Sequence, residues 1–164
     1  MVGNNAWNAY TREHLEQQYP NLASEGYTIT SPDTIDYNCV AWAAEAEDEW
    51  WWPDAMGQEY WPEGIPREET LSAFTAAFST IGYEVCDDAS IEPGFLEIAI
   101  YGDAQKVPRH VARQLTNGEW TSKIGQYEDI RHKTLEALSG EAPAYGTVIQ
   151  LMRKSAAKLS STES

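Results

Sequence analysis

Cys39 is the residue of this sequence whose position best suits covalent chemistry. It follows Asn38, which can cap a helix, and an alanine-rich run after it predicts a helix over 40–49. Unpaired backbone N–H groups in the first turn of a helix favour a thiolate, and they can also bind the oxyanion that forms when sulfur attacks a carbonyl. We therefore expect Cys39 to be a nucleophile with a lowered pKa. A buried, inert cysteine is the alternative, and position alone favours it.

A cysteine nucleophile needs a base, and His110 is the best candidate among the three histidines. His14 lies in a predicted helix near the N-terminus, and His132 lies in a predicted helix near the C-terminus. His110 begins a predicted strand, where a rigid sheet could hold its imidazole toward a helix N-terminus packed across it. The alternative is a histidine exposed at a strand end.

The elements that would hold these two residues are helices followed by strands. The stretch 7–19 has no glycine or proline and predicts a first helix, and a helix from Pro66 to Gly82 has a clear apolar face. Asn117-Gly118 predicts a two-residue hairpin turn. The predicted strands are 83–86, 95–101, 109–115, 119–124 and 145–152, with one more helix over 128–138. The fold class is α+β, with N-terminal helices packed on a small antiparallel sheet.

Length and charge describe one acidic domain. We expect a single domain over 1–154 and a disordered polar tail over 155–164 in this chain of 164 residues. The formal charge is −17 over residues 1–100 and +2 over residues 101–164, which together give −15. Such a surface repels nucleic acid and anionic membranes, and it keeps a protein in solution as a monomer.

Several kinds of site and location are disfavoured. The sequence has no apolar run long enough to span a bilayer and no signal-peptide pattern, so we expect a cytoplasmic protein without membrane or nucleic-acid partners. Cys39 and Cys86 are too far apart for a paired zinc motif, and Glu128 with His132 is a lone acid–histidine pair. No phosphate-binding motif is present. We expect no metal and no cofactor.

Several short motifs carry a resemblance to a known group of proteins. They are Tyr-Asn-Cys-Val-Ala-Trp at 37–42, Trp-Trp-Trp-Pro at 50–53, the His110 strand, Trp-Thr-Ser-Lys-Ile-Gly at 120–125, Asp-Ile-Arg-His at 129–132 and Tyr-Gly-Thr-Val at 145–148. Over about 36–152 the chain resembles a family of uncharacterised bacterial domains that is similar to papain-like, NlpC-type cysteine hydrolases. The resemblance implies a papain-like fold with Cys39 as nucleophile and His110 as its histidine.

The resemblance also implies a third polar residue that orients the histidine, and Ser122, Gln126 and Asp129 are the candidates. A two-residue turn would pair His110 with Gly125 and place Ser122 on the other face of the sheet. Asp129 is therefore our choice, because a carboxylate stabilises an imidazolium better than an amide does. The alternative for Asp129 is an acid in the first turn of a helix.

Tryptophan is abundant after the cysteine, and Trp42 is our candidate for lining a substrate cleft. Trp42 follows Cys39 by three positions, although it could be a core residue. Trp50, Trp51 and Trp52 are expected mainly to fill the core.

Two functions fit these residues. The first is a cysteine hydrolase of the peptidase, amidase or deamidase type, which acts through Cys39 and His110 on an amide or thioester, for example in a peptide or protein. The second is a non-catalytic, acidic partner-binding or immunity-type domain of the same fold. The charge asymmetry favours the second, whereas the Cys–His pair favours the first.

Overall fold

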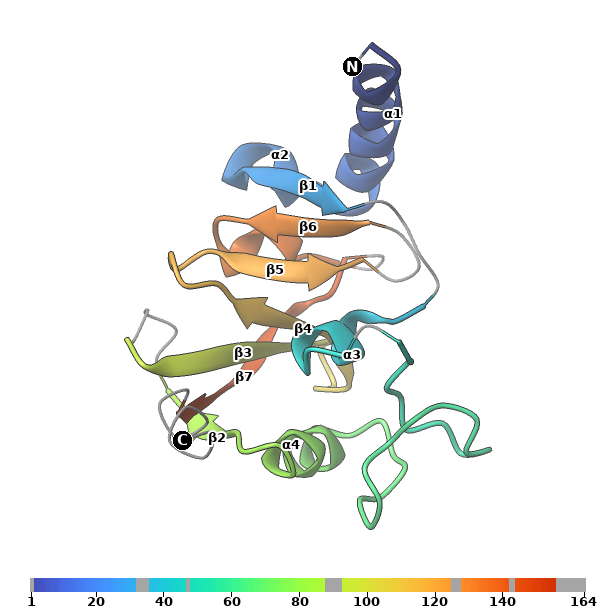
Figure 1. Cartoon of the computed structure of the whole chain (residues 1–164), viewed down its shortest axis with the longest axis vertical. Coiled ribbons are helices and arrows are strands. Elements are labelled where there is room, and N and C mark those ends of the chain that lie inside the picture. The colour runs from blue at the N-terminus through green and yellow to red at the C-terminus, as the bar shows by residue number, and fades with distance from the viewer. Residues whose placement is uncertain are drawn as a thin grey trace.

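A computed structural model describes residues 2–31, 36–46, 48–87, 93–124, 128–141 and 144–155, and its centre is a seven-stranded antiparallel sheet (Figure 1). Across the sheet the strands lie in the order β1 (Tyr27–Ser31), β6 (Asp129–His132), β5 (Trp120–Lys123), β4 (Pro108–Gln114), β3 (Phe95–Gly102), β7 (Thr147–Ser155) and β2 (Glu84–Cys86). The helices are α1 (Val2–Gln18), α2 (Asn21–Glu25), α3 (Cys39–Ala43), α4 (Leu71–Ser79) and the 3-10 helix η1 (Leu135–Leu138). The expected α+β class and antiparallel sheet are confirmed.

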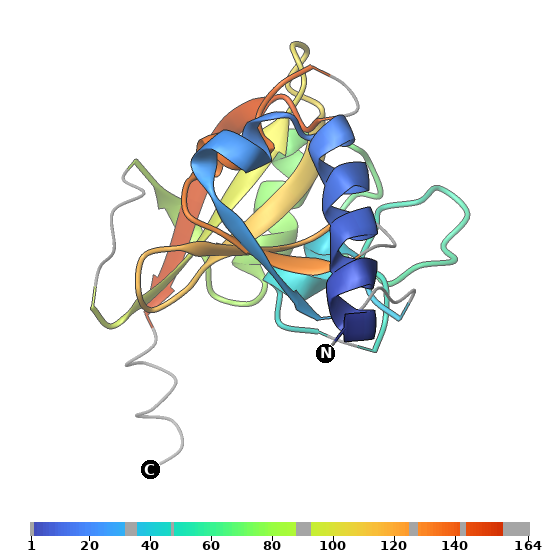
Figure 2. The ribbon, with the colours of Figure 1, turned by 90° about the horizontal axis from the view of Figure 1, so that it is seen from above.

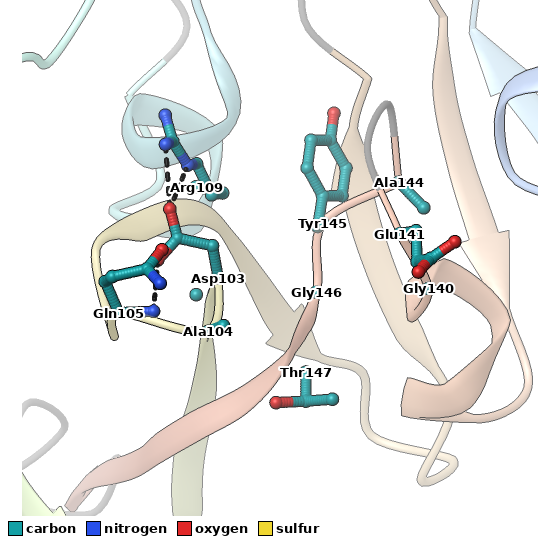
Figure 3. Close-up of a pocket in the computed structure, with 11 residues that line it drawn as sticks. Asp103, Ala104, Gln105, Arg109, Gly140, Glu141, Ala144, Tyr145, Gly146 and Thr147 are labelled. Carbon is teal, nitrogen blue, oxygen red and sulfur yellow. Dashed lines mark hydrogen bonds and ion pairs between the residues drawn. The ribbon is translucent and has the colours of Figure 1, made fainter.

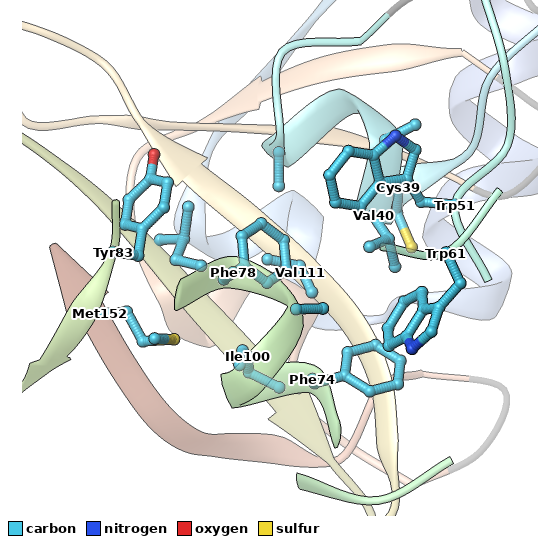
Figure 4. Packing of buried hydrophobic residues seen from close by; sticks show 14 of the residues in the cluster. Cys39, Val40, Trp51, Trp61, Phe74, Phe78, Tyr83, Ile100, Val111 and Met152 are labelled. Carbon is cyan, nitrogen blue, oxygen red and sulfur yellow. The ribbon is translucent and has the colours of Figure 1, made fainter. Parts of the chain in front are cut away.

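Helices cover both faces of the sheet. α1 and α2 lie at the β1 end and α4 at the β2 end, and a view from above places α1 next to β1 (Figures 1 and 2). Because side chains alternate along a strand, the sheet divides the core into two clusters. One cluster joins α3 and α4 to strand residues such as Ile100, Val111 and Met152 (Figure 4). The other joins α1 and α2 to strand residues such as Tyr101, Ala112 and Ile130.

The helix that begins with Cys39 is shorter than expected. Asn38 caps α3 as predicted, because its side-chain oxygen accepts the N–H of Ala41 at 3.1 Å. The helix ends at Ala43 rather than at 49, and Glu45 has a φ of 66°, which no α-helix accommodates. The predicted helix after Pro66 begins only at Leu71, where the Thr70 side chain accepts the N–H of Ala73.

The prediction of a helix over 128–138 is wrong. This segment forms strand β6 and then the short η1. β6 pairs with β1, which was not predicted as a strand because the sequence around it is rich in turn-forming residues. The strand pattern was hidden because both faces of β6 carry buried polar side chains, Asp129 on one and His132 on the other. His132 is therefore a strand residue.

The turn between β4 and β5 also differs from its prediction. Leu115 and Glu119 close a three-residue loop, and the registered pairs are Arg113 with Thr121 and Gln114 with Trp120. The register predicted from a two-residue turn differs from the observed one by one position. This difference reverses the face of the sheet on which every side chain of β5 lies. His110 and Ser122 consequently lie on the same face of the sheet.

Two further observations complete the fold. No helix among the residues that the structure describes is long and apolar enough to cross a membrane. Apart from Ser155, the predicted tail lies outside the described residues, as does Gln126.

Candidate active site

Cys39 lies where strands β4 and β5 stop pairing. Their pairing ends at Arg113 and Thr121. Val111, two residues before Arg113 on β4, donates its backbone N–H to the Cys39 sulfur. The backbone N–H groups of Val40 and of Cys39 itself also face the sulfur. The sulfur is thus surrounded by backbone donors, as expected for the start of a helix.

The expected low pKa of Cys39 is not what this environment produces. The residue is only 7% exposed, and it packs at the edge of the α3–α4 core beside Trp51 (Figure 4). Burial raises the pKa of the thiol to about 11, and the backbone donors and the charge of Lys123 offset this only in part. Desolvation outweighs the helix terminus, because α3 has only five residues. Cys39 is therefore a neutral thiol at pH 7.

His110 belongs to a buried chain of hydrogen bonds across three strands. Its Nε2 lies 2.9 Å from the hydroxyl of Ser122 on β5, and this hydroxyl lies 2.8 Å from Nε2 of His132 on β6. The other ring nitrogen of His132, Nδ1, lies 2.8 Å from the carbonyl oxygen of Thr134. His110, Ser122 and His132 are all completely buried.

Aromatic rings enclose His110. The ring of Tyr145 stacks flat on it with centroids 4.2 Å apart, and the ring of Tyr101 meets it edge-on at 5.4 Å. Burial lowers the pKa of His110 well below its usual value, and the nearby His132 lowers it further. His110 Nδ1 is buried without a hydrogen-bond partner among the described residues. The ring is therefore neutral at pH 7, with one nitrogen held and the other available.

Tyr145 connects the cysteine with the histidine. It stacks on His110, and together with Cys39 it lines a cavity of about 380 Å³, which we call the Cys39 cavity. No hydrogen bond joins the thiol to His110. The two groups are linked instead through Val111, which follows His110 in the strand and donates its N–H to the sulfur. The thiol packs in the α3–α4 cluster, whereas the imidazole packs against Tyr101 on the other face of the sheet, so the two neutral groups are related through Val111 and Tyr145 rather than by direct contact.

A larger cavity of about 900 Å³ lies beside the Cys39 cavity and shares Tyr145 and Arg109 with it. Arg109 lines both, and its guanidinium donates two hydrogen bonds to one oxygen of Asp103, at 2.8 and 3.1 Å. Across the larger cavity from this pair lie Tyr145 and Glu141 (Figure 3). The two cavities thus adjoin at Tyr145 and Arg109.

Asp129 does not lie next to His110, contrary to our choice of the third residue. Its Oδ2 accepts a hydrogen bond from the hydroxyl of Tyr37 at 2.5 Å. It pairs in register with Lys123, whose ammonium lies 5.6 Å from the centre of the Tyr37 ring. This buried polar cluster is on the opposite face of the sheet from His110, and Ser122 occupies the place intended for Asp129.

The tryptophans that face the Cys39 cavity are Trp50 and Trp52, whereas Trp42 does not line it. Trp42 stacks on Tyr37 and donates its indole N–H to Thr121 at 3.0 Å. Of the three adjacent tryptophans, only Trp51 is in the core as predicted. Three tryptophans in a row cannot all point inward, and this signal could have identified the cavity wall.

The described residues contain no cluster of three or more histidine, cysteine or acidic side chains that could hold a metal ion. Glu128 is buried, and His132 is engaged by Ser122 and Thr134, so the pair noted in the sequence forms no such cluster. Cys86 is half-buried on the edge strand β2.

Comparison with known proteins adds one relationship. Residues 28–153 match a family described as a domain of unknown function, DUF7689. No curated protein matches the chain. No solved structure matches it either. The matched range contains Cys39, His110, Ser122 and His132.

Proposed function

We propose that this chain, which belongs to the DUF7689 family of domains of unknown function, is a cysteine hydrolase in which Cys39 is the nucleophile and His110 is the base. One observation carries the proposal. His110 is completely buried, its Nε2 is held by Ser122, and its Nδ1 has no partner among the described residues, one residue along β4 from the N–H that contacts the Cys39 sulfur. A buried polar nitrogen without a partner is costly to a fold, and such costs are typical of functional sites.

The proposed reaction starts from a neutral thiol and a neutral imidazole. As the sulfur attacks the carbonyl carbon of an amide or thioester, its proton passes to Nδ1 of His110, and an S–C bond forms. His110 then gives this proton to the departing amine or thiol as the old C–N or C–S bond breaks. Water then attacks the acyl carbon while His110 takes its proton, the S–C bond breaks to release the acid, and the proton returns to the Cys39 sulfur. The backbone N–H groups around Cys39 are suited to stabilise the oxyanion.

Proton transfer must accompany attack in this scheme, because both pKa shifts oppose a resting ion pair. Burial raises the pKa of Cys39 and lowers that of His110, so a separate thiolate and imidazolium would be strongly disfavoured before substrate binds. The thiol and Nδ1 must also approach each other. A carbonyl bound in the Cys39 cavity would place the reacting carbon beside the sulfur.

The order of the parts supports a papain-like relationship, which we also propose. A cysteine begins a helix, its histidine lies on a later strand, and a polar residue on the next strand contacts the histidine. That third residue is Ser122 rather than Asp129. An amide in a peptide or protein is the substrate class that suits two adjoining cavities, and we expect the enzyme to act as a monomer in the cytoplasm.

The burial of Cys39 favours a second candidate, a non-catalytic domain of the same fold. A thiol with a pKa near 11 that does not contact the histidine directly is also what an inert core cysteine would show. In this case the acidic front half of the chain would bind a basic partner. The two candidates differ in whether Cys39 can be acylated.

The test is acylation of the full chain by p-nitrophenyl acetate at pH 7.5. We expect a burst of p-nitrophenol and an acetyl group on Cys39, identified by peptide mass spectrometry. His110→Gln should slow this acylation by about 10²-fold or more, since a general base contributes that much. Cys86→Ala is the matched control and should leave the burst unchanged. A burst that survives Cys39→Ala, or no acetyl group on Cys39, would overturn the hydrolase.

A further inference from the structure

His132 is a second buried histidine in this site, and the reaction as written leaves it without a role. It lies on β6, two strands away from His110, and it contacts His110 only through the Ser122 hydroxyl. Burying an imidazole costs free energy because it removes polar ring nitrogens from water. An apolar side chain would fill the same space at lower cost. The role of His132 can be inferred from which atom donates and which accepts in each hydrogen bond.

The direction of each hydrogen bond follows from the far end of the chain. The carbonyl oxygen of Thr134 can only accept, so the proton between it and His132 must be on Nδ1 of His132. His132 is neutral at pH 7, since burial lowers its pKa to about 4, and its Nε2 therefore carries a lone pair. That lone pair accepts the single hydroxyl hydrogen of Ser122.

The same logic reaches His110. Because Ser122 has given its hydrogen to His132, its oxygen can only accept from His110. The proton of the neutral His110 ring must then be on Nε2, and Nδ1 must carry the lone pair. This is the tautomer that the proposed reaction needs, because the thiol proton passes to Nδ1 in it. The opposite tautomer would present an N–H where the thiol proton has to go.

We propose that His132 is a positioning residue which, through the hydroxyl of Ser122, fixes the proton of His110 on Nε2 and keeps Nδ1 unprotonated. This role rests on the proposed function only for its purpose, because the tautomer is a property of the resting protein. Without an acceptor at His132, the Ser122 hydroxyl turns to donate to Nε2 of His110. The proton of His110 then moves to Nδ1, and the ring ceases to be a base toward Cys39.

Two variants of His132 separate this role from simple packing. In His132→Gln the amide oxygen can take the place of Nε2 and accept the Ser122 hydrogen. In His132→Leu a side chain of similar bulk offers no acceptor. A role limited to filling space predicts that Leu is tolerated at least as well as Gln, whereas the proposal predicts the reverse.

The first measurement is the tautomer itself, from the nitrogen-15 resonances of the histidine rings at pH 7. In the wild type, Nδ1 of His110 should show the resonance of an unprotonated imidazole nitrogen and Nε2 that of an N–H. His132→Leu should exchange the two, and His132→Gln should retain the wild-type pattern. His14, which lies on α1 and contacts Gln18, is the internal reference and should not change. A proton on Nδ1 of His110 in the folded wild type would overturn the proposal.

The second measurement is the acylation rate of Cys39 by p-nitrophenyl acetate. We expect His132→Leu to slow it at least about 10-fold, because a histidine in the wrong tautomer cannot accept the proton, and His132→Gln to recover most of the loss. Equal rates in the two variants would overturn the role in catalysis. Should the wild type show the expected tautomer but no acylation, the hydrolase would fail while the relay stands. If His132→Leu does not fold, the wild-type tautomer still decides the question.

Discussion

The two central residues of the candidate site are neutral rather than charged. Cys39 and His110 are both buried, and burial moves their pKa values in opposite directions, away from the thiolate–imidazolium pair that an exposed site would favour. In a neutral pair, the ability of His110 to accept a proton depends on which of its ring nitrogens carries the ring proton. A single hydroxyl, that of Ser122, controls this proton because it is the only group described between the two histidine Nε2 atoms.

Alkylation rates of the two cysteines should reflect this burial. At pH 7 a thiol with a pKa near 11 has roughly 300-fold less thiolate than an ordinary exposed cysteine. Cys86 is half-buried on an edge strand, so iodoacetamide should label Cys86 faster than Cys39 in the native protein. This order is the reverse of what a helix N-terminus alone predicts. Labelling of each cysteine is measured by mass spectrometry over time.

The pH profile completes this prediction. The labelling rate of Cys39 should still be rising at about pH 10, since the pKa of the thiol is about 11, and in urea the two cysteines should react at similar rates. Faster labelling of native Cys39 at pH 7, with a plateau below pH 8, would show that a thiolate–imidazolium pair exists at rest and that the neutral description is wrong.

At the scale of the elements, the segment before β7 holds Tyr145 against His110. Gly140 and Gly146 exchange two backbone hydrogen bonds of 2.9 Å, which fixes the backbone on either side of Tyr145. Gly146 has a φ of 81°, and a Cβ on it would lie 2.0 Å from the carbonyl oxygen of Gly102. Only glycine allows this approach between β7 and the end of β3.

Gly146→Ala should therefore destabilise the protein and displace Tyr145. Gly94→Ala is the matched control, because Gly94 has a similar φ of 86° but nothing within 4 Å of an added Cβ. The control should lose about 1–2 kcal/mol through backbone strain alone. Gly146→Ala should lose clearly more in urea denaturation, and it should also slow acylation of Cys39. Equal losses in the two variants would mean that the contact with Gly102 yields easily.

The elements also show what the sequence could predict and what it could not. Strands with a consistent apolar side, such as β3, were predicted because hydrophobic alternation is visible in one sequence. β6 was missed because Asp129 and His132 interrupt this alternation on opposite faces, and their partners come from distant segments.

The candidate site residues differ in how far local sequence patterns could select them. Cys39 and His110 could be selected from local patterns, a helix cap and a strand. Ser122 could not, because its side depends on whether the hairpin has two or three loop residues, and Asn117-Gly118 suits both. The raised pKa of Cys39 was also hidden, since desolvation depends on packing that only the assembled fold provides.

At the scale of the whole molecule, charge and burial separate in space. The acidic residues of the front half that the structure describes lie mostly on the surface, whereas most of the buried polar residues lie on strands, on both faces of the sheet. Surface carboxylates repel one another less as the pH falls toward the isoelectric point near 4.4, which stabilises the fold. Buried neutral histidines act in the opposite direction over the same pH range.

The free energy of unfolding should therefore respond to acid through His132 and His110. Their pKa values in the folded protein lie below the value of about 6.5 for an unfolded chain, so between these values the unfolded state binds more protons and stability falls as the pH falls. With a folded pKa of about 4, His132 alone should cost about 2 kcal/mol at pH 5 relative to pH 8. Asp54 and Asp103, whose pKa values are lowered, lose their contributions only below about pH 4, outside this window.

Comparison with His132→Gln isolates this effect from the surface charges, which are the same in both proteins. Urea denaturation at pH 8, 6 and 5 should show that the wild type loses about 2 kcal/mol more than the variant between pH 8 and pH 5. At alkaline pH the free energy of unfolding should instead fall as the pH rises. Cys39 keeps its proton in the fold up to about pH 11, so its contribution should be lost as the pH rises from 9 and should be absent in Cys39→Ala. Parallel curves for wild type and His132→Gln from pH 8 to 5 would mean that His132 is protonated without cost, and the neutral chain of hydrogen bonds would have to be abandoned.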